Sequence, residues 1–144
     1  MAKLKIKSLI GDFKPKQKGL GKVLGPLEAA VMDIIWRKEE ATVRDVYETL
    51  NGSRKIAYTT VMTIMTRLAD KDLLLKDKEG IAYTYRPAVS KEFFTKSLVG
   101  EVMDGLFDDY ADAAFSHFME RVEEDEDKIA QLEQLIKNRR DKGE

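Results

Sequence analysis

Cysteine is absent from this 144-residue sequence, and histidine occurs once, as His117. Without cysteine the chain cannot form disulfides, thiolate metal sites, iron–sulfur clusters or a cysteine nucleophile. A single histidine also makes a catalytic triad or a histidine-rich metal site hard to assemble. An active site built only from carboxylates is the remaining enzymatic alternative. We therefore expect no enzymatic activity, no metal and no cofactor.

Long apolar runs are also missing from the sequence. No run approaches the ~18 residues that a membrane-spanning helix needs. The basic N-terminus lacks the apolar segment of ~7–15 residues that secretory signals contain. We accordingly expect a cytoplasmic protein with no membrane insertion. With 43% hydrophobic and 35% charged residues, the composition is that of a folded globular chain.

The net charge is only −1, but the charges are unevenly distributed along the chain. Residues 1–22 contain seven lysines and one aspartate, residues 23–89 carry ten charges of each sign, and residues 90–144 carry eight basic and fifteen acidic residues. The first segment also contains several glycines, which predicts a flexible basic leader. Such a leader is either a solvated tail or an arm that contacts DNA phosphates or a membrane surface. Because charge is balanced over 23–89, nucleic-acid binding there depends on where the charges lie.

Three helices are predicted after the leader from the spacing of apolar residues. The first begins at Pro26, a residue suited to a first helical turn. Its Trp36 lies off the apolar stripe, and we expect the ring to pack against a later element. The second helix follows Thr42, which we expect to pair with Asp45 as a helix cap. The third runs over about residues 58–71.

The third helix carries an unusual set of side chains on its outer face. Its buried face is predicted to comprise Val61, Ile64, Met65 and Leu68. The opposite face then carries hydroxyl and charged side chains, namely Thr59, Thr63, Thr66 and Asp70, with Thr60 and Arg67 on its flank. Solvated helix faces usually carry Lys and Glu, whereas threonine can bond phosphates or base edges and can touch the methyl group of thymine. We interpret this face as reading DNA; the alternative is that Thr59 and Thr60 only cap the helix.

A β-hairpin is predicted after the third helix. Leu73-Leu74-Leu75 begins it, residues 77–80 are expected to turn, and residues 81–86 alternate so that Ile81, Tyr83 and Tyr85 share one buried face. Lys76 and Lys78 are then expected at the hairpin tip, where they can follow the phosphates. Three helices followed by a hairpin form the winged-helix plan, a relative of the helix-turn-helix.

From Ser90 onward the pattern is helical and rich in large apolar side chains, beginning with Phe94 and Leu98. The acidic run at residues 123–127 suits the start of a last helix through the helix dipole. So many apolar side chains are best buried against a second copy of the chain. The predicted dimer interface comprises Phe107, Tyr110, Phe118, Ile129, Leu132, Leu135 and Ile136.

The expected fold class is therefore mainly α with a small β-hairpin. We expect a winged helix-turn-helix DNA-binding domain at residues 23–89 and a C-terminal helical dimerisation domain at residues 90–144, after the leader at 1–22.

Four segments in this order resemble the penicillinase-repressor family (BlaI/MecI-type winged-helix transcriptional regulators), namely residues 24–36, 41–46, 57–68 and 83–87. The likeness extends from Leu24 to about Asn138. The resemblance implies a homodimeric repressor on a palindromic DNA operator, with one recognition helix in the major groove of each half-site. It implies base-reading roles for Thr59, Thr60, Thr63 and Arg67. It also implies phosphate contacts for Arg54, Lys55 and Lys78.

The resemblance further implies how repression ends. In known members a membrane-bound sensor triggers cleavage within the dimerisation region, and the matching bond here is His117–Phe118. The family's bond usually follows asparagine, which this chain replaces by histidine. A sensor-activated protease is therefore an expected partner. The alternative function is a winged-helix protein-interaction module without sequence-specific DNA binding, which would not need hydroxyl groups on the third helix.

Overall fold

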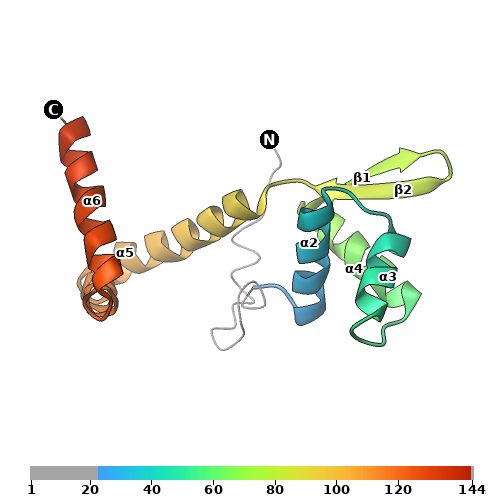
Figure 1. Ribbon diagram of the computed structural model, residues 1–144, viewed down its shortest axis with the longest axis horizontal. Coiled ribbons are helices and arrows are strands. Elements are labelled where there is room, and N and C mark those ends of the chain that lie inside the picture. Colours follow the sequence, from blue (N-terminus) through green and yellow to red (C-terminus); the bar gives the residue numbers. More distant parts are fainter. Residues whose placement is uncertain (1–22, 144) are drawn as a thin grey trace. The chain divides into compact units, whose positions relative to one another are not determined.

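The computed structural model describes residues 23–143, so the leader expected at residues 1–22 lies outside the described residues. The helices and strands follow one another as α2 (Pro26–Lys38), α3 (Val43–Asn51), α4 (Tyr58–Asp70), β1 (Leu74–Glu79), β2 (Ala82–Pro87), α5 (Lys91–Glu123) and α6 (Glu126–Lys142). The fold is mainly helical with one antiparallel hairpin, as predicted (Figure 1). Its contacts form two compact units, which meet in sequence between Glu101 and Val102.

Local signals set where the helices of the first unit begin. Pro26 is the first residue of α2, where its missing N–H has no intrahelical partner to lose. At α3 the Thr42 hydroxyl accepts a hydrogen bond from Asp45 N at 3.1 Å, and the Asp45 carboxylate accepts one from Thr42 N at 2.9 Å. The predicted cap is confirmed. The hydrogen bond from the Thr42 backbone also lowers the pKa of the Asp45 carboxyl from its usual value.

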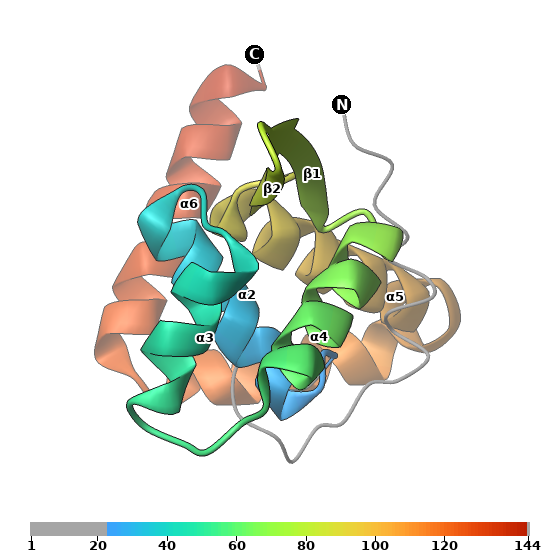
Figure 2. The ribbon, with the colours of Figure 1, turned by 90° about the vertical axis from the view of Figure 1, so that its right-hand side faces the viewer.

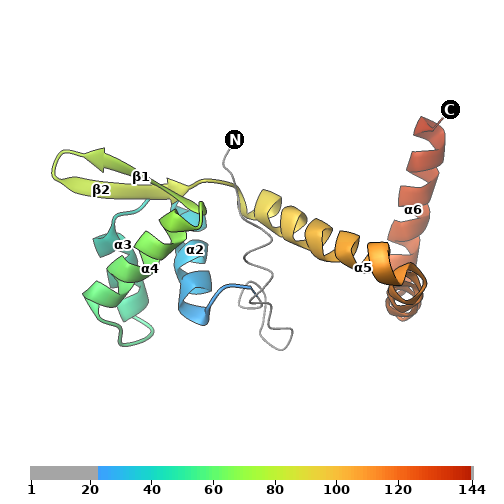
Figure 3. The ribbon, with the colours of Figure 1, turned by 180° about the vertical axis from the view of Figure 1, so that it is seen from behind.

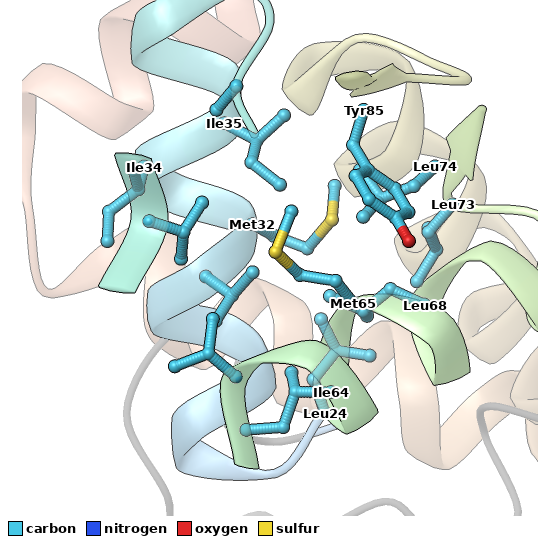
Figure 4. Close-up of a cluster of buried hydrophobic side chains, with 14 of the residues drawn as sticks. Leu24, Met32, Ile34, Ile35, Ile64, Met65, Leu68, Leu73, Leu74 and Tyr85 are labelled. Carbon is cyan, nitrogen blue, oxygen red and sulfur yellow. The ribbon is translucent and has the colours of Figure 1, made fainter. Parts of the chain in front are cut away.

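One apolar core joins α2, α4 and the hairpin. All four residues predicted to face inward from α4 are buried, at 5% exposure or less. In Figure 4 Ile64, Met65 and Leu68 of α4 lie in one cluster with Met32 and Ile35 of α2 and with Leu73 and Tyr85 at the base of the hairpin. Because α4 is held along its inner side by this core, its outer side is presented as a rigid surface.

The hairpin differs from the prediction in its turn and its exposure. Strand pairing runs from Leu74 opposite Pro87 to residue 79 opposite residue 82, so the turn is Gly80-Ile81 and not residues 77–80. Gly80 has φ 64°, which suits the first central position of a tight hairpin turn. The predicted buried face is also wrong, since Ile81 is 100% exposed and Tyr83 44% exposed, while Tyr85 is buried. The hairpin projects beyond the three helices, so only its base touches the core (Figure 3).

The start of α5 belongs to the first unit and packs against its core. Trp36 Nε1 donates a hydrogen bond to Val89 O at 2.9 Å, and its ring lies 6.0 Å from that of Phe94. The prediction that Trp36 packs against a later element is confirmed. Phe94 is fully buried and Leu98 packs beside the core. The unit that holds the core therefore extends past Val89, to Glu101.

The second unit comprises the rest of α5 and α6. The backbone of α5 leaves helical geometry at Tyr110, with φ −136° and ψ 44°, which kinks the helix there. After α5 ends at Glu123, Asp125 caps α6 by accepting a hydrogen bond from Asp127 N at 2.9 Å. The predicted start of a last helix at the acidic run is confirmed. Within residues 23–143, no helix is both long and apolar enough to cross a membrane.

Candidate nucleic-acid interface and dimer surface

The outer face of α4 brings together the residues predicted to read bases. Thr59, Thr60, Thr63 and Arg67 are all exposed. At 100° per residue, Thr59 and Thr63 lie at the centre of this face and Thr60 and Arg67 on one flank. Figure 2 shows α4 beside α3 and below the hairpin, on the same side of the first unit.

The first turn of α4 has no side-chain cap. Its N-cap is Ala57, and Thr59 and Thr60 lie inside the helix rather than at the cap position. The alternative in which these threonines serve only as caps is therefore not what the structure shows. Backbone N–H groups of an uncapped first turn can bind an anion, helped by the helix dipole. Arg54 and Lys55 are exposed just before this turn.

Two threonine hydroxyls on α4 are already engaged by the helix itself. Thr63 Oγ1 donates to Thr59 O at 3.0 Å, and Thr66 Oγ1 donates to Met62 O at 2.9 Å. A hydroxyl has one proton to donate, so each of these oxygens keeps only its acceptor capacity. The side-chain methyl groups keep their ability to make apolar contacts.

Two exposed apolar residues of α4 were missed by the sequence analysis. Tyr58 is 45% exposed and Met62 is 42% exposed. The Tyr58 ring packs edge-on against Tyr47 of α3, with 5.5 Å between ring centroids. Sequence reasoning assigns large apolar residues to the core. The signal that could have found these two is their angular position, which lies outside the stripe of the four buried residues.

The hairpin carries a basic and aromatic face. The register pairs Lys76 with Tyr85 and Lys78 with Tyr83, which places these four side chains on one face of the hairpin. Lys76 Nζ lies 4.1 Å from the centroid of the Tyr83 ring, and Lys78 Nζ lies 5.9 Å from it. Such cation–π contacts hold ammonium groups beside exposed rings. Both lysines lie in β1 and not at the tip, because the turn is at Gly80-Ile81.

An ion pair helps to fix the end of α4. Lys71 Nζ lies 2.9 Å from Glu28 Oε2 in the first turn of α2, and the Glu28 side chain is only 17% exposed. Because the pair is partly shielded from water, it is less screened than a surface pair. It therefore adds to the core contacts that orient α4.

The predicted dimer residues lie on α5 and α6. The five that are exposed range from 39% to 65% exposure, namely Phe107, Tyr110, Phe118, Leu135 and Ile136. Ile129 and Leu132 are partly exposed. A groove of about 500 Å³ runs along α5 and is lined almost entirely by apolar atoms, among them those of Met103, Leu106, Ala114 and Phe118. This apolar surface remains open in a single chain.

The bond predicted as a cleavage point lies within a helix. His117 and Phe118 are both inside α5 and both exposed. Proteases act on chain segments that are open to them, so a bond held in a helix requires local unwinding before it can be cut.

Comparison with known proteins gives three matches of note. The chain is 43% identical to "Transcriptional regulator BlaI" of Mycobacterium tuberculosis over 105 residues, which is 72% of this chain and 76% of that protein. It is 25% identical to "Methicillin resistance regulatory protein MecI" of Mammaliicoccus sciuri over 113 residues, which is 76% of this chain and 89% of that protein. A solution structure of the DNA-binding domain of the repressor BlaI aligns with a TM-score of 0.45 at 25% identity, covering 52% of this chain and 90% of that one.

A family comparison covers more of the chain. The sequence profile described as "Penicillinase repressor" matches residues 24–138, which include α2 to α5 and most of α6. The first of these relatives is described as a regulator of transcription and the second as a regulatory protein. With this match and the 43% identical relative, the chain belongs to the penicillinase repressor family.

Proposed function

We propose that this chain is a sequence-specific DNA-binding transcriptional repressor that acts as a homodimer on a palindromic operator. The observation that carries the proposal is the outer face of α4. There Thr59, Thr60, Thr63 and Arg67 are exposed together on a helix whose inner side is locked into the core. A rigid helix with side chains suited to base edges is what major-groove readout requires.

Phosphate contacts are assigned to basic residues on either side of this face. Arg54 and Lys55 precede the uncapped start of α4, and Lys78 lies on the basic face of the hairpin. Contacts of this kind fix the position of a protein on the duplex without reading its sequence. They also make the affinity depend on salt, because bound counterions are released.

The partner assigned to the tail is a second copy of the chain. Exposed apolar residues on α5 and α6 make a surface that one chain leaves open to water. A self-complementary pairing of two such surfaces buries both and presents two copies of α4 to a palindrome. This arrangement supports one half-site for each protomer.

We assign the release of repression to the same surface of α5 and α6. A signal that weakens the pairing of the two copies lowers the affinity for a two-part operator. Proteolysis at His117–Phe118 by a sensor-activated protease is one such signal, and it requires α5 to open locally. Histidine at this bond means that the protease would have to accept a residue other than asparagine.

The test is a binding titration of the full-length protein on duplexes selected from a random pool. We expect an enriched palindrome, and we expect its affinity to fall steeply between low and moderate salt because several phosphates are contacted. An unrelated duplex of equal length is the control and should bind much more weakly. Affinity that is insensitive to both salt and sequence would contradict the proposal and favour a protein-interaction module.

A further inference from the structure

We propose that α4 recognises the 5-methyl groups of thymines in the major groove, through the thioether of Met62 and the methyl group of Thr63. The hydroxyls of Thr63 and Thr66 do not act as hydrogen-bond donors to bases. The inference rests on the proposed DNA-binding function and names the chemistry that the same face reads.

The first step concerns the hydroxyl protons. Those of Thr63 and Thr66 are donated to backbone carbonyls one turn earlier, at 3.0 and 2.9 Å. The oxygens can therefore accept from the amino groups of adenine or cytosine. With these bonds kept, they do not donate to O4 of thymine or to O6 and N7 of guanine. What Thr63 and Thr66 offer outward is methyl groups and acceptors.

The second step concerns Met62. Around the axis of α4, Met62 lies between the four buried residues and the threonines of the outer face, and it is 42% exposed. Tyr58 lies on the same flank of the helix. The Tyr58 ring is held against Tyr47 of α3. Met62 is thus the flexible apolar side chain at the edge of the threonine row, and its thioether adapts to irregular apolar surfaces. In the major groove the apolar group on a base edge is the thymine methyl.

The third step is how such contacts add to specificity. A thymine methyl that packs against Met62 or against the Thr63 methyl is removed from water, together with the side-chain atoms that it touches. Cytosine in the same position has only a hydrogen at C5 and makes no such contact. The arrangement therefore favours thymine through the burial of its methyl group.

The experiment replaces thymine by uracil in the duplex selected by the full-length protein, one position at a time. Uracil lacks the 5-methyl group but keeps every base-pairing hydrogen bond. We expect at least one position in each half-site where uracil weakens binding by about fourfold, the effect of one buried methyl group. Where Met62 touches the thymine methyl, we expect uracil to have no further effect on the affinity of Met62→Ala. Where Thr63 touches it, we expect the same of Thr63→Ser.

A pair of variants separates the methyl from the hydroxyl. Thr63→Val keeps the shape and the methyl but removes the hydroxyl, and we expect affinity within about twofold of the wild type, well under the effect of a lost buried methyl. Thr63→Ser keeps the hydroxyl and removes the methyl, and should lower affinity about fourfold. Because Met62 and Thr63 are exposed, these variants should fold, and their thermal unfolding curves should overlay that of the wild type.

Three results would overturn the inference while leaving DNA binding intact. One is uracil having less than a twofold effect at every position. Another is a uracil effect that persists unchanged in Met62→Ala and Thr63→Ser. The third is loss of binding in Thr63→Val with binding retained in Thr63→Ser, which would assign the reading to the hydroxyl. A random pool that yields no enriched sequence would instead overturn the proposed function, and the inference with it.

Discussion

At the residue scale, the cap of α3 shows how short sequence signals become local structure. Thr42 and Asp45 were predicted as a pair because a hydroxyl and a carboxylate three residues apart can each bond the other's backbone N–H. Both bonds form. This feature could be predicted because all its atoms lie within four consecutive residues.

The cap yields a stability prediction. Thr42→Ala removes the acceptor for Asp45 N and should lower the free energy of unfolding by about 1 kcal/mol, measured by urea titration at neutral pH. Thr49→Ala is the matched control, since Thr49 Oγ1 only bonds Asp45 O within the same helix and alanine is the better helix former. Equal losses in the two variants would contradict the role of the cap.

The same cap predicts how stability depends on pH. The pKa of Asp45 is lowered in the folded chain, chiefly by the hydrogen bond from the Thr42 backbone. Its stabilising contribution is therefore full above the unfolded pKa near 3.8 and is lost as the pH falls through the lower, folded value. Asp45→Asn should lose less stability than the wild type as the pH falls from above 3.8 to below the folded pKa, as followed by urea titrations at several pH values. Parallel losses in the two proteins would remove Asp45 as a source of the acid sensitivity.

Lys78 yields a prediction about charge rather than sequence. Lys78→Ala should lower the affinity for the selected palindrome and for unrelated duplexes by a similar factor, and should reduce the slope of log affinity against log salt by about 1. Lys137→Ala on α6 is the control and should change neither quantity, because Lys137 is exposed on the acidic tail. An effect of Lys78→Ala confined to the palindrome would mean that Lys78 reads bases.

At the element scale, the helices were predictable and the hairpin turn was not. Helical spacing in α4 identifies Val61, Ile64, Met65 and Leu68 because their positions depend on one local repeat. The position of the hairpin turn depends on the register in which β1 pairs with β2, and this register is not fixed by the apolar pattern alone. Tyr85 also exchanges two backbone hydrogen bonds with Ala41, at 2.8 and 2.9 Å, and this bridge fixes which end of β2 is buried.

Ile81 and Met62 show the converse limit on prediction. Both are large apolar residues, and the alternation of residues 81–86 predicted that Ile81 is buried. Ile81 instead lies in the hairpin turn, and Met62 lies in α4 beside the buried residues. Ile81 is fully exposed because the hairpin extends beyond the core. Met62 is exposed because it lies beside the buried face of α4 and not on it. The local sequence pattern does not predict how much of a helix or hairpin is covered by the apolar core.

The tail yields a prediction at this scale. Leu132→Asp places a carboxylate on the partly exposed apolar side of α6 and should shift the protein from dimer to monomer in sedimentation. DNA binding should weaken with it. Gln134→Asp puts the same charge on the opposite side of α6 and should stay dimeric. A Leu132→Asp protein that sediments as a dimer would exclude this side of α6 from the interface.

At the scale of the whole molecule, the distribution of charge and of exposed apolar residues suggests different roles for the two parts of the chain. Residues 90–144 carry fifteen acidic and eight basic residues, so we expect the tail to be repelled by DNA and phosphate contacts to come from the first part of the chain. The proposed contribution of the tail is pairing through its exposed apolar side chains. In the proposed dimer, affinity for an operator depends on two copies acting together.

This dependence predicts a role for half-site spacing. Adding five base pairs between the half-sites rotates one of them by about half a helical turn. A dimer should then bind about as weakly as it binds one isolated half-site, as measured by anisotropy with the full-length protein. Adding about ten base pairs, a full helical turn, is the control, because it returns both half-sites to the same side of the duplex. Equal affinity at all spacings would indicate that the protomers bind independently.

Trp36 gives the molecule a built-in optical reporter. It is the one tryptophan in the sequence, and its indole N–H is held by Val89 O while its ring lies beside Phe94 at the start of α5. Its ultraviolet emission therefore comes from a single, partly shielded environment. Any event that lifts the start of α5 from the core hydrates the indole and moves that emission to longer wavelength, so it can be followed without an added label.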